Sequence, residues 1–503
     1  MNALASLNPS DAMLWAFLGP AAVALLVALL GKWPNIRETA TLIGSSSIFA
    51  LVAGNLLPAV SAGGRPRWEG VEVLPGLQLV FELEPLGMVF ALVASGLWIV
   101  TSIYAVGYMR GHNEKNQTRF FVCFALAIFG ALGVAFSGNM FTLFVFYEAI
   151  TLSTFPLVTH HGTEAAKRSG RVYLGILMGT SIAFLLLAVA WTQFLAGTTD
   201  FKVGGILDGN ITQELLPWLL ALYALGTAKA ALMPFHRWLP AAMVAPTPVS
   251  ALLHAVAVVK AGVFTITKVV IYVFGIDLLS NTGASTWLQA LAAFTLLSAA
   301  IVALGQNNLK RRLAYSTISQ LAYIVLGASL VTQAAVVGAG LHIVTHAMGK
   351  ITLFFCAGAI YVGAHRSDIS QMHGLGRKMP WTFAAFLVGS LSIIGIPPLG
   401  GAWSKWFLAS GAVDASRLPV VALYMVSSLL AIGYLMPVVA KAFFFPPPDR
   451  DHDGTPDEFV DVREPLLCVL PPVLTAAGCV ALFFFMEPVA ALLRSIWTQG
   501  GMP

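Results

Sequence analysis

Long apolar stretches alternate with short polar connections along the whole chain. A helix needs about 20 apolar residues to cross roughly 30 Å of hydrocarbon, and about fourteen stretches reach that length. They are longer than a barrel strand and lack strict alternation, so they predict helices. The predicted helices cover about 13–31, 38–59, 85–107, 119–137, 140–158, 171–196, 215–238, 248–273, 286–305, 313–331, 338–362, 382–410, 420–445 and 466–493.

Composition supports an all-α polytopic membrane protein. Of the 503 residues, 58% are hydrophobic and only 10% are charged, against about 25% charged in a soluble domain. A soluble enzyme, a nucleic-acid-binding protein and a disordered scaffold are therefore excluded. Cysteines lie in apolar runs without metal-ligand spacing, so we expect neither a metal nor a cofactor; they are Cys123, Cys356, Cys468 and Cys479. The N-terminus has no basic n-region and no cleavage site, which predicts a retained first helix.

The polar connections differ in charge. Those after odd-numbered helices are basic, as at 110–119 and 310–312, whereas those after even-numbered helices are acidic or nearly uncharged, as at 200–208. Basic loops remain in the cytoplasm. We therefore expect the odd-numbered connections there, and both termini on the outer side of a plasma (inner) membrane.

We expect a single transmembrane domain, 1–503, without a soluble module. Its predicted parts are N-terminal helices 1–3 (1–118), a first repeat (119–273), a second repeat (286–445), a cytoplasmic acidic loop (446–465) and a last helix (466–493). Within the loop, 449–457 resembles the start of a calcium-binding loop, but Val460 stands where such a loop needs a glutamate. The favoured interpretation is a solvated linker.

Several ionisable residues lie near the middle of predicted helices, where each costs about 2.5–3.5 kcal/mol. They are Glu148, Lys229, His254, Lys260, His342, His346, Lys350 and Lys405. Snorkelling toward a helix end accounts for Lys268, but not for groups at mid-span. Two alternatives are ion pairs that only join helices, and a metal at the two histidines of 342–346, for which no third ligand is evident. A proton relay needs such a chain of titratable groups at similar depth.

Two predicted helices also contain breakers at depth: Pro234 in the seventh, and Pro397 and Pro398 in the twelfth. Proline removes a backbone donor and disrupts the preceding turn, so we expect an unwound stretch at each place. The two breaks are five helices apart. If helices 4–8 and 9–13 are repeats, the second is inverted in the membrane, as in many secondary transporters.

Four sequence blocks resemble the antiporter-like subunits of respiratory complex I, of Mrp cation/proton antiporters and of membrane-bound hydrogenases. The blocks are FELEPLGMVFALVASGLWIVTSIYAVGYMRG with RFF at 119–121, KAALMPFHRWLPAAMVAPTPVSALLHAVAVVKAGVF at 229–264, NLKRRLAYSTISQLAYI at 308–324 and GIPPLGGAWSKWFL at 395–408. The resemblance covers most of the chain. Lysine at 405, without a long C-terminal helix, looks closest to the D-type subunit of the Mrp antiporters.

The resemblance implies a role for each buried group. Glu148 would be the fifth-helix carboxylate that pairs with Lys229, Lys260 the central eighth-helix lysine, and Lys405 the terminal group. His254, with His342 and His346, would link them; Lys350 has no assigned role. Protonating Glu148 would remove the counter-charge of Lys229, an interaction of about 4 kcal/mol at 4 Å and a dielectric of 20. The proton of Lys229 could then move on.

Three functions remain open. The first is a proton-translocating subunit of a multi-subunit Na⁺ or K⁺/H⁺ antiporter, which is not an enzyme. The second is the proton-pumping subunit of a complex I-like oxidoreductase or membrane-bound hydrogenase, with redox chemistry on partner subunits. The third is a proton-coupled subunit of an inorganic-carbon uptake complex. All three place the chain in the bilayer among other membrane subunits, with protons and Na⁺ or K⁺ as ligands and no nucleic acid.

Overall fold

The computed structural model describes residues 7–74, 76–446 and 462–499, and nearly all of them are helical. In this part of the chain, 11 helices are long and apolar enough to cross a membrane. They are α2 (Pro9–Leu29), α3 to α4 (Pro34–Ser61), α5 (Pro85–Gly111), α6 (Gln117–Ala135), α7 (Met140–Val158), α8 to α9 (Glu164–Ala196), α12 to α13 with the π-helical turn that follows (Thr247–Phe274), α15 (Thr286–Leu304), α17 (Gln333–Ala364), α20 (Leu418–Phe444) and α21 (Leu466–Phe484).

Seven more α-helices complete the described part of the chain. These are α10 (Leu216–Gly226), α11 (Trp238–Ala241), α14 (Ile276–Thr282), α16 (Leu309–Ser329), α18 (Pro380–Ile394), α19 (Gly401–Asp414) and α22 (Met486–Gln499). The predicted fold class is confirmed, whereas the count of fourteen and the inverted repeats stay predictions. The last predicted helix, 466–493, is not continuous, because α21 ends at Phe484 and α22 begins at Met486. The acidic motif at 449–457 lies outside the described residues.

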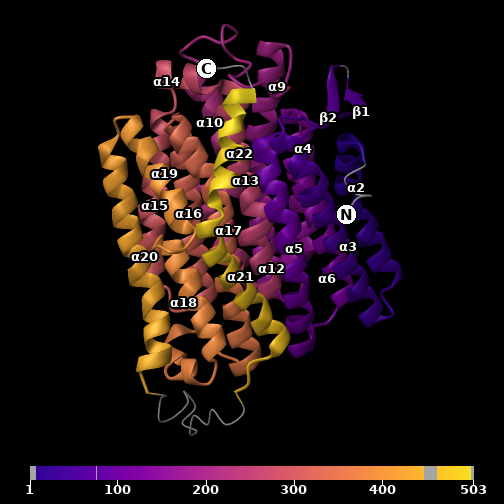
Figure 1. The fold of residues 1–503 in the computed structure, drawn as a ribbon, viewed down its shortest axis with the longest axis vertical. Coiled ribbons are helices and arrows are strands. Elements are labelled where there is room, and N and C mark those ends of the chain that lie inside the picture. The colour runs from indigo at the N-terminus through magenta and orange to yellow at the C-terminus, as the bar shows by residue number, and fades with distance from the viewer. Residues whose placement is uncertain (1–6, 75, 447–461, 500–503) are drawn as a thin grey trace.

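Two helices have almost no lipid-facing side. The segment Thr247–Phe274 is 100% buried within its most apolar window, and α17 is 89% buried. In Figure 1, α17 runs through the middle of the bundle, with α5 and α6 to one side and α15, α16 and α20 to the other. It packs against α5, α12, α16, α18, α19 and α21. Polar side chains on these two helices therefore face protein rather than hydrocarbon.

The fully buried segment departs from α-helical geometry twice. Between α12 (Thr247–Ala251) and α13 (Val258–Lys268) lies a π-helical turn, Leu252–Val256, and a second π-helical turn, Val269–Phe274, follows α13. A π-helical turn shifts the helical faces and is frequent at functional sites. The first turn contains His254, so the spacing between His254 and Lys260 is not that of a regular helix.

A β-hairpin is an element that hydropathy did not predict. Strands β1 (Arg67–Leu74) and β2 (Leu77–Glu82) pair antiparallel, with Arg67 opposite Glu82 and Trp68 opposite Phe81. The hairpin stands above α2 in Figure 1. It lies in the second predicted connection, one of those expected to be acidic or nearly uncharged, and its strands are too short to span a membrane.

The connections gather at two opposite ends of the bundle. One end, here named the basic end, comprises 112–116, 159–163, 242–246, 305–308 and 365–379; for example, Leu309 N donates to Ser367 O over 2.9 Å. The other, the hairpin end, carries β1 and β2, with a bridge between Phe81 and Ser137 and another between Asn139 and Asp200. These five connections, all predicted as odd-numbered, thus share one end.

Candidate functional site

Lys229 lies in a break of the seventh predicted helix. The α-helix α10 ends at Gly226, a short 3-10 turn covers Ala228–Ala230, and α-helical geometry resumes only at Trp238. The indole N–H of Trp238 donates to the carbonyl of Ala228 over 2.9 Å, which satisfies one of the backbone groups that the break releases. Pro234 stands within the same non-helical stretch.

Tyr147 on α7 holds the side chain of Lys229. The Lys229 Nζ donates to the Tyr147 carbonyl over 2.5 Å and lies 3.2 Å from the centroid of the Tyr147 ring. The backbone N–H of Lys229 donates to the Tyr147 hydroxyl over 3.1 Å. Lys229 is 0% exposed. A lysine without a carboxylate contact is thus stabilised by a carbonyl and the face of an aromatic ring.

Glu148, the residue after Tyr147, is close but not in contact with Lys229. Both of its carboxylate oxygens are buried and have no hydrogen-bond partner in the described part of the chain. The negative charge of Glu148 still interacts electrostatically with Lys229. The expected pair is therefore not a direct ion pair in this structure; the Lys229 ammonium donates to the Tyr147 carbonyl instead. A buried carboxylate without a partner is a place where a proton or a cation would be stabilised.

A glycine on the neighbouring helix sets the position of Lys229. A Cβ atom on Gly262, in α13, would lie 2.2 Å from the backbone N of Ala230 and 2.4 Å from the carbonyl carbon of Lys229. Both are backbone atoms, so no side-chain rotation relieves the clash. The absence of a side chain lets α13 approach the broken helix closely, which brings Lys260 and Lys229 onto neighbouring backbones.

Lys260, His346 and His342 form a continuous row between α13 and α17. The Lys260 Nζ lies 2.5 Å from His346 Nδ1, and the His346 and His342 rings are stacked with centroids 5.9 Å apart. All three side chains are almost fully buried. His254 is 0% exposed, and neither of its ring nitrogens has a partner in the described part of the chain. Its ring packs on Phe354, with centroids 4.6 Å apart.

Hydroxyl and amide groups bind the far end of this row. His342 Nδ1 lies 2.9 Å from Ser404 Oγ, and His342 Nε2 lies 3.1 Å from Gln320 Oε1. Ser404 precedes Lys405 on α19, which follows the break that contains Pro397 and Pro398. The ring of Tyr323 stacks on His342, with centroids 5.4 Å apart, and the Lys405 Nζ lies 4.9 Å from the same ring.

Lys405 caps the broken twelfth helix. Its Nζ donates to the carbonyl of Ile394, the last residue of α18, over 2.8 Å, and to Ser428 Oγ over 2.8 Å. Gly395 follows with a φ of 93°, and a Cβ there would lie 2.7 Å from Lys405 Cδ. A left-handed residue without a side chain is therefore required where α18 ends. The break thus supplies both the free carbonyl and the space that Lys405 uses.

Lys350 leaves the row of α17 and reaches toward α16. It donates to Ser316 Oγ over 2.5 Å, and Ser316 Oγ donates in turn to the Tyr434 hydroxyl over 3.0 Å.

The expectation for Lys268 was wrong. Snorkelling was expected, but Lys268 is 0% exposed, and its Nζ lies 3.4 Å from Glu84 Oε1 and donates to the Ser137 carbonyl over 2.6 Å.

Sequence reasoning found the ionisable groups but not their partners. The partners carry no charge, so nothing in the sequence sets them apart from other residues of their helices; they are Tyr147, Gln320, Tyr323 and Ser404. Only the proximity of Ser404 to Lys405 in the sequence gave a local signal. Among the described residues, no group of three or more His, Cys, Asp or Glu side chains is arranged to hold a metal ion.

Fold and site together define a multi-pass membrane protein with a buried row of lysines and histidines between two broken helices. Residues 137–431, more than half of the chain, match the family described as NADH:quinone oxidoreductase/Mrp antiporter, transmembrane. The chain belongs to this family. The expected resemblance to antiporter-like subunits is thereby confirmed.

Relatives come from more than one kind of complex. The chain is 32% identical over 403 residues to NADH-quinone oxidoreductase subunit N of Desulforudis audaxviator, covering 78% of this chain and 76% of that protein. It is 32% identical to the A/B subunit of a probable K⁺/H⁺ antiporter of Rhizobium meliloti, covering 79% of this chain and 40% of that protein. Hydrogenase-4 component B of Escherichia coli is also 32% identical, with coverage of 70% and 54%. The chain thus spans about half the length of the last two relatives.

Solved structures show the same fold. A chain in the Mrp complex from Dietzia sp. aligns with a TM-score of 0.84 at 21% identity, covering 97% of this chain and 96% of that one. A chain of the membrane-bound sulfane sulfur reductase, an archaeal respiratory membrane complex, aligns with a TM-score of 0.81 at 22% identity, covering 97% and 98%.

Proposed function

We propose that this chain is the proton-translocating subunit of a multi-subunit monovalent cation/proton antiporter. The carrying observation is the buried row Lys260, His346 and His342, which continues through Ser404 toward Lys405. Each neighbour in that row is within hydrogen-bond or stacking distance of the next. Ionisable groups buried this deeply in a membrane are costly, and they are typical of proton relays.

The mechanism follows from charge. Glu148 has no hydrogen-bond partner among the described residues, so binding a proton or a cation there neutralises an uncompensated carboxylate. Neutralising Glu148 removes the counter-charge that acts on Lys229, and the Lys229 proton can then pass toward Lys260 through water and His254. Protonating one member of the Lys260–His346 pair displaces the charge along α17 toward Lys405.

A second candidate function is proton pumping within a complex I-like oxidoreductase or a membrane-bound hydrogenase. The coverage of NADH-quinone oxidoreductase subunit N, 76% of that protein, favours it. The redox chemistry would then belong to partner subunits. In either case we place the chain in a plasma membrane, among other membrane subunits, with the basic end in the cytoplasm and both termini outside.

The test uses everted vesicles from an antiporter-deficient bacterial host that expresses the chain with its neighbouring genes. A pH-sensitive dye reports proton movement after addition of Na⁺, K⁺ or NADH. We expect a cation-triggered response that Glu148→Gln and Lys229→Ala abolish, and that the exposed-surface variant Lys167→Ala retains. A response only to NADH, also lost in both variants, would favour the redox pump. Unchanged transport in both variants would contradict either function.

A further inference from the structure

A cavity of about 250 Å³ opens at the basic end, and neither Lys229 nor Pro234 lines it. Five parts of the chain line it: the end of α5 with the connection after it, the connection after α7, the start of α12 with the residues before it, the start of α16, and the end of α17 with the connection after it. Its polar lining includes His112, Glu114, His161, Thr247 and Lys310. None of these residues belongs to the row described above.

Glu114, which lines this cavity, is the centre of a group of three histidines. Its carboxylate lies 3.1 Å from His161 Nε2, 3.8 Å from His160 Nε2 and 4.0 Å from His112 Nε2. The Glu114 side chain is only 7% exposed, whereas that of His161 is 36% exposed. One nearly buried carboxylate therefore faces three imidazoles, and the one at hydrogen-bond distance reaches solvent.

This arrangement shifts the proton affinity of its members. The hydrogen bond to Glu114 raises the pKa of His161 above its ordinary value, although burial acts in the opposite direction. Burial alone would raise the pKa of Glu114, but the hydrogen bond to His161 and the charges of the three histidines lower it. Burial lowers the pKa of His160. Of His160 and His161, His161 is thus the one that binds a proton more readily near neutral pH.

Charged groups from other elements also face the cluster. Lys310, at the start of α16, acts on both Glu114 and His161. Arg119, on α6, acts on His160 and donates to its carbonyl over 2.9 Å. Arg366 borders the cavity from the connection after α17. All three are cations, so Glu114 supplies the counter-charge that a protonated histidine needs.

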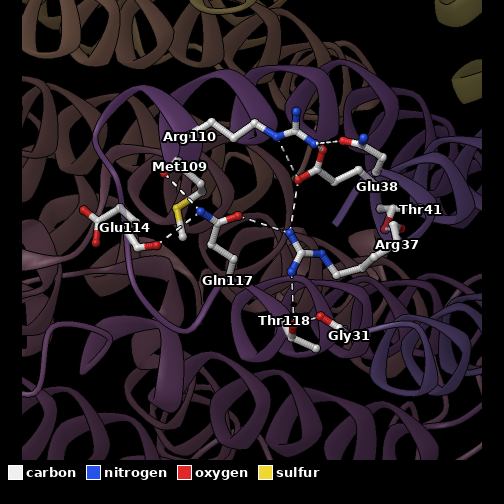
Figure 2. Close-up of polar contacts among 10 residues, drawn as sticks. Gly31, Arg37, Glu38, Thr41, Met109, Arg110, Glu114, Gln117 and Thr118 are labelled. Carbon is white, nitrogen blue, oxygen red and sulfur yellow. Dashed lines mark hydrogen bonds and ion pairs between the residues drawn. The ribbon is translucent and has the colours of Figure 1, made fainter. Parts of the chain in front are cut away.

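Side-chain contacts from α3, α5 and α6 hold the connection that carries Glu114. Figure 2 shows that Arg37 bridges Glu38 and Gln117, while Arg110 pairs with Glu38. The side-chain amide of Gln117 donates to the backbone carbonyls of Met109 and Glu114, over 3.3 and 3.2 Å. These contacts close the turn between α5 and α6, and they hold Glu114 in place opposite His161.

Unpartnered polar groups lead from the cavity to His254. The Tyr104 hydroxyl, the Ser250 hydroxyl and both His254 ring nitrogens are buried without a hydrogen-bond partner in the described part of the chain. Thr247, Ser250 and His254 follow one another on the same buried segment, and Tyr104 lies one turn from Tyr108, which lines the cavity. A Cβ on Gly358 would meet both the Tyr104 hydroxyl and Thr247. Buried polar groups of this kind are usually satisfied by water.

We infer that the Glu114–His161 cluster is a proton-binding site that collects protons at the basic end and delivers them, through water along Tyr104 and Ser250, to His254. The inference rests on the proposed function. His161 takes the proton from solvent on its exposed ring, and Glu114 stabilises the imidazolium. The proton leaves toward the cavity water, which returns His161 to its neutral form.

The decisive measurement is the pH profile of transport in everted vesicles, where a cytoplasmic basic end faces the bath. Transport should fall as the bath pH rises through the pKa of His161. Glu114→Gln removes the counter-charge, so the fall should begin at lower pH, with transport about tenfold lower on the alkaline side and near normal on the acid side. Glu164→Gln, an exposed carboxylate at the same end that pairs with Lys167, should leave the profile unchanged.

A second readout does not depend on transport. Diethyl pyrocarbonate modifies the neutral imidazole, so mass spectrometry of the modified peptide gives the titration of His161 in the intact complex. In Glu114→Gln we expect His161 to be modified at lower pH than in the wild type. An unchanged titration, or a transport loss that is equal at every pH, would overturn the inference. The Glu114–His161 contact would then only hold two connections together. A wild type that titrates as expected but moves no protons would instead contradict the proposed function.

Discussion

The Lys260 ammonium and His346 Nδ1 lie 2.5 Å apart, although the residues are 86 positions apart in the sequence. Both side chains are buried, at 0% and 1% exposure. Lysine in its charged form only donates hydrogen bonds, so the ring nitrogen that faces it must accept. A second proton would place two like charges side by side away from water. The pair can therefore carry at most one positive charge between α13 and α17.

We expect Lys260→Met and His346→Phe each to lower proton transport by a factor on the order of a hundred, the usual contribution of one positioned proton donor or acceptor. Because the two residues act as a unit, the double variant should be no worse than either single one. The dye assay in everted vesicles measures all three rates, with Lys167→Ala as the exposed control. Losses that multiply in the double variant would show that the two residues act independently.

Tyr147 offers a graded test of how Lys229 is held. Tyr147→Phe keeps the ring and the backbone carbonyl, and removes only the hydroxyl that accepts from Lys229 N. We expect about 1 kcal/mol of lost stability, measured by thermal unfolding of the purified complex, and near-normal transport. Tyr147→Leu also removes the ring face, which is worth about 2 kcal/mol to a desolvated cation. Transport should then fall about tenfold or more; equal rates in the two variants would exclude a role for the ring.

The sequence predicted the helices and the buried charges for the same physical reason. Apolar runs of membrane-spanning length are visible in any window, and a lysine at mid-span, such as Lys260, stands out because it is costly there. The partners of these buried groups could not be predicted, since Ser404 and Gln320 become hydrogen-bond partners of His342 only when α16, α17 and α19 pack together. The π-helical turn at His254 and the hairpin of β1 and β2 depend on tertiary contacts in the same way.

Charge pairing was the least predictable part of the site. Glu148 and Lys229 were expected to touch, but the Tyr147 carbonyl competes for the ammonium group at 2.5 Å. Conversely, the Lys268 side chain was expected to extend toward the membrane surface, because Lys268 lies eight residues after Lys260, toward the end of the predicted helix. In the fold, the connection 136–139 and the start of α5 cover that position. Local sequence does not contain this information.

Gly262 tests whether the approach of α13 to the broken helix matters for function. A Cβ in Gly262→Ala would clash with backbone atoms of Lys229 and Ala230. We expect about 1–3 kcal/mol of lost stability from overpacking. Transport should fall about a hundredfold, because a misplacement of about 1 Å is enough to disrupt proton transfer. In the matched control Gly175→Ala, on α8, the added Cβ meets nothing within 4 Å, and both properties should stay normal. Normal transport by Gly262→Ala would show that the turn tolerates displacement.

The ion pair of Glu84 and Lys268 joins several elements at the hairpin end. Glu84 accepts from the backbone N–H groups of Leu86 and Gly87 at the start of α5, and from the Tyr272 hydroxyl over 2.7 Å. Lys268 adds a bond to the Ser137 carbonyl. Both side chains are nearly inaccessible to solvent, at 4% and 0% exposure. The pair therefore ties the start of α5, the end of α13 and the connection 136–139 together.

Removing one member of this pair should cost more than removing both. Lys268→Met leaves the Glu84 charge buried and uncompensated, a loss of about 3–5 kcal/mol. In the double variant with Glu84→Gln no charge remains, so part of that stability should return; thermal unfolding of the purified complex measures both. The exposed control Glu69→Gln should stay within about 0.5 kcal/mol of the wild type. We expect transport per folded complex to be unchanged in the double variant, because the pair is structural. A stable double variant without transport would instead place Lys268 in the proton path beyond Lys260.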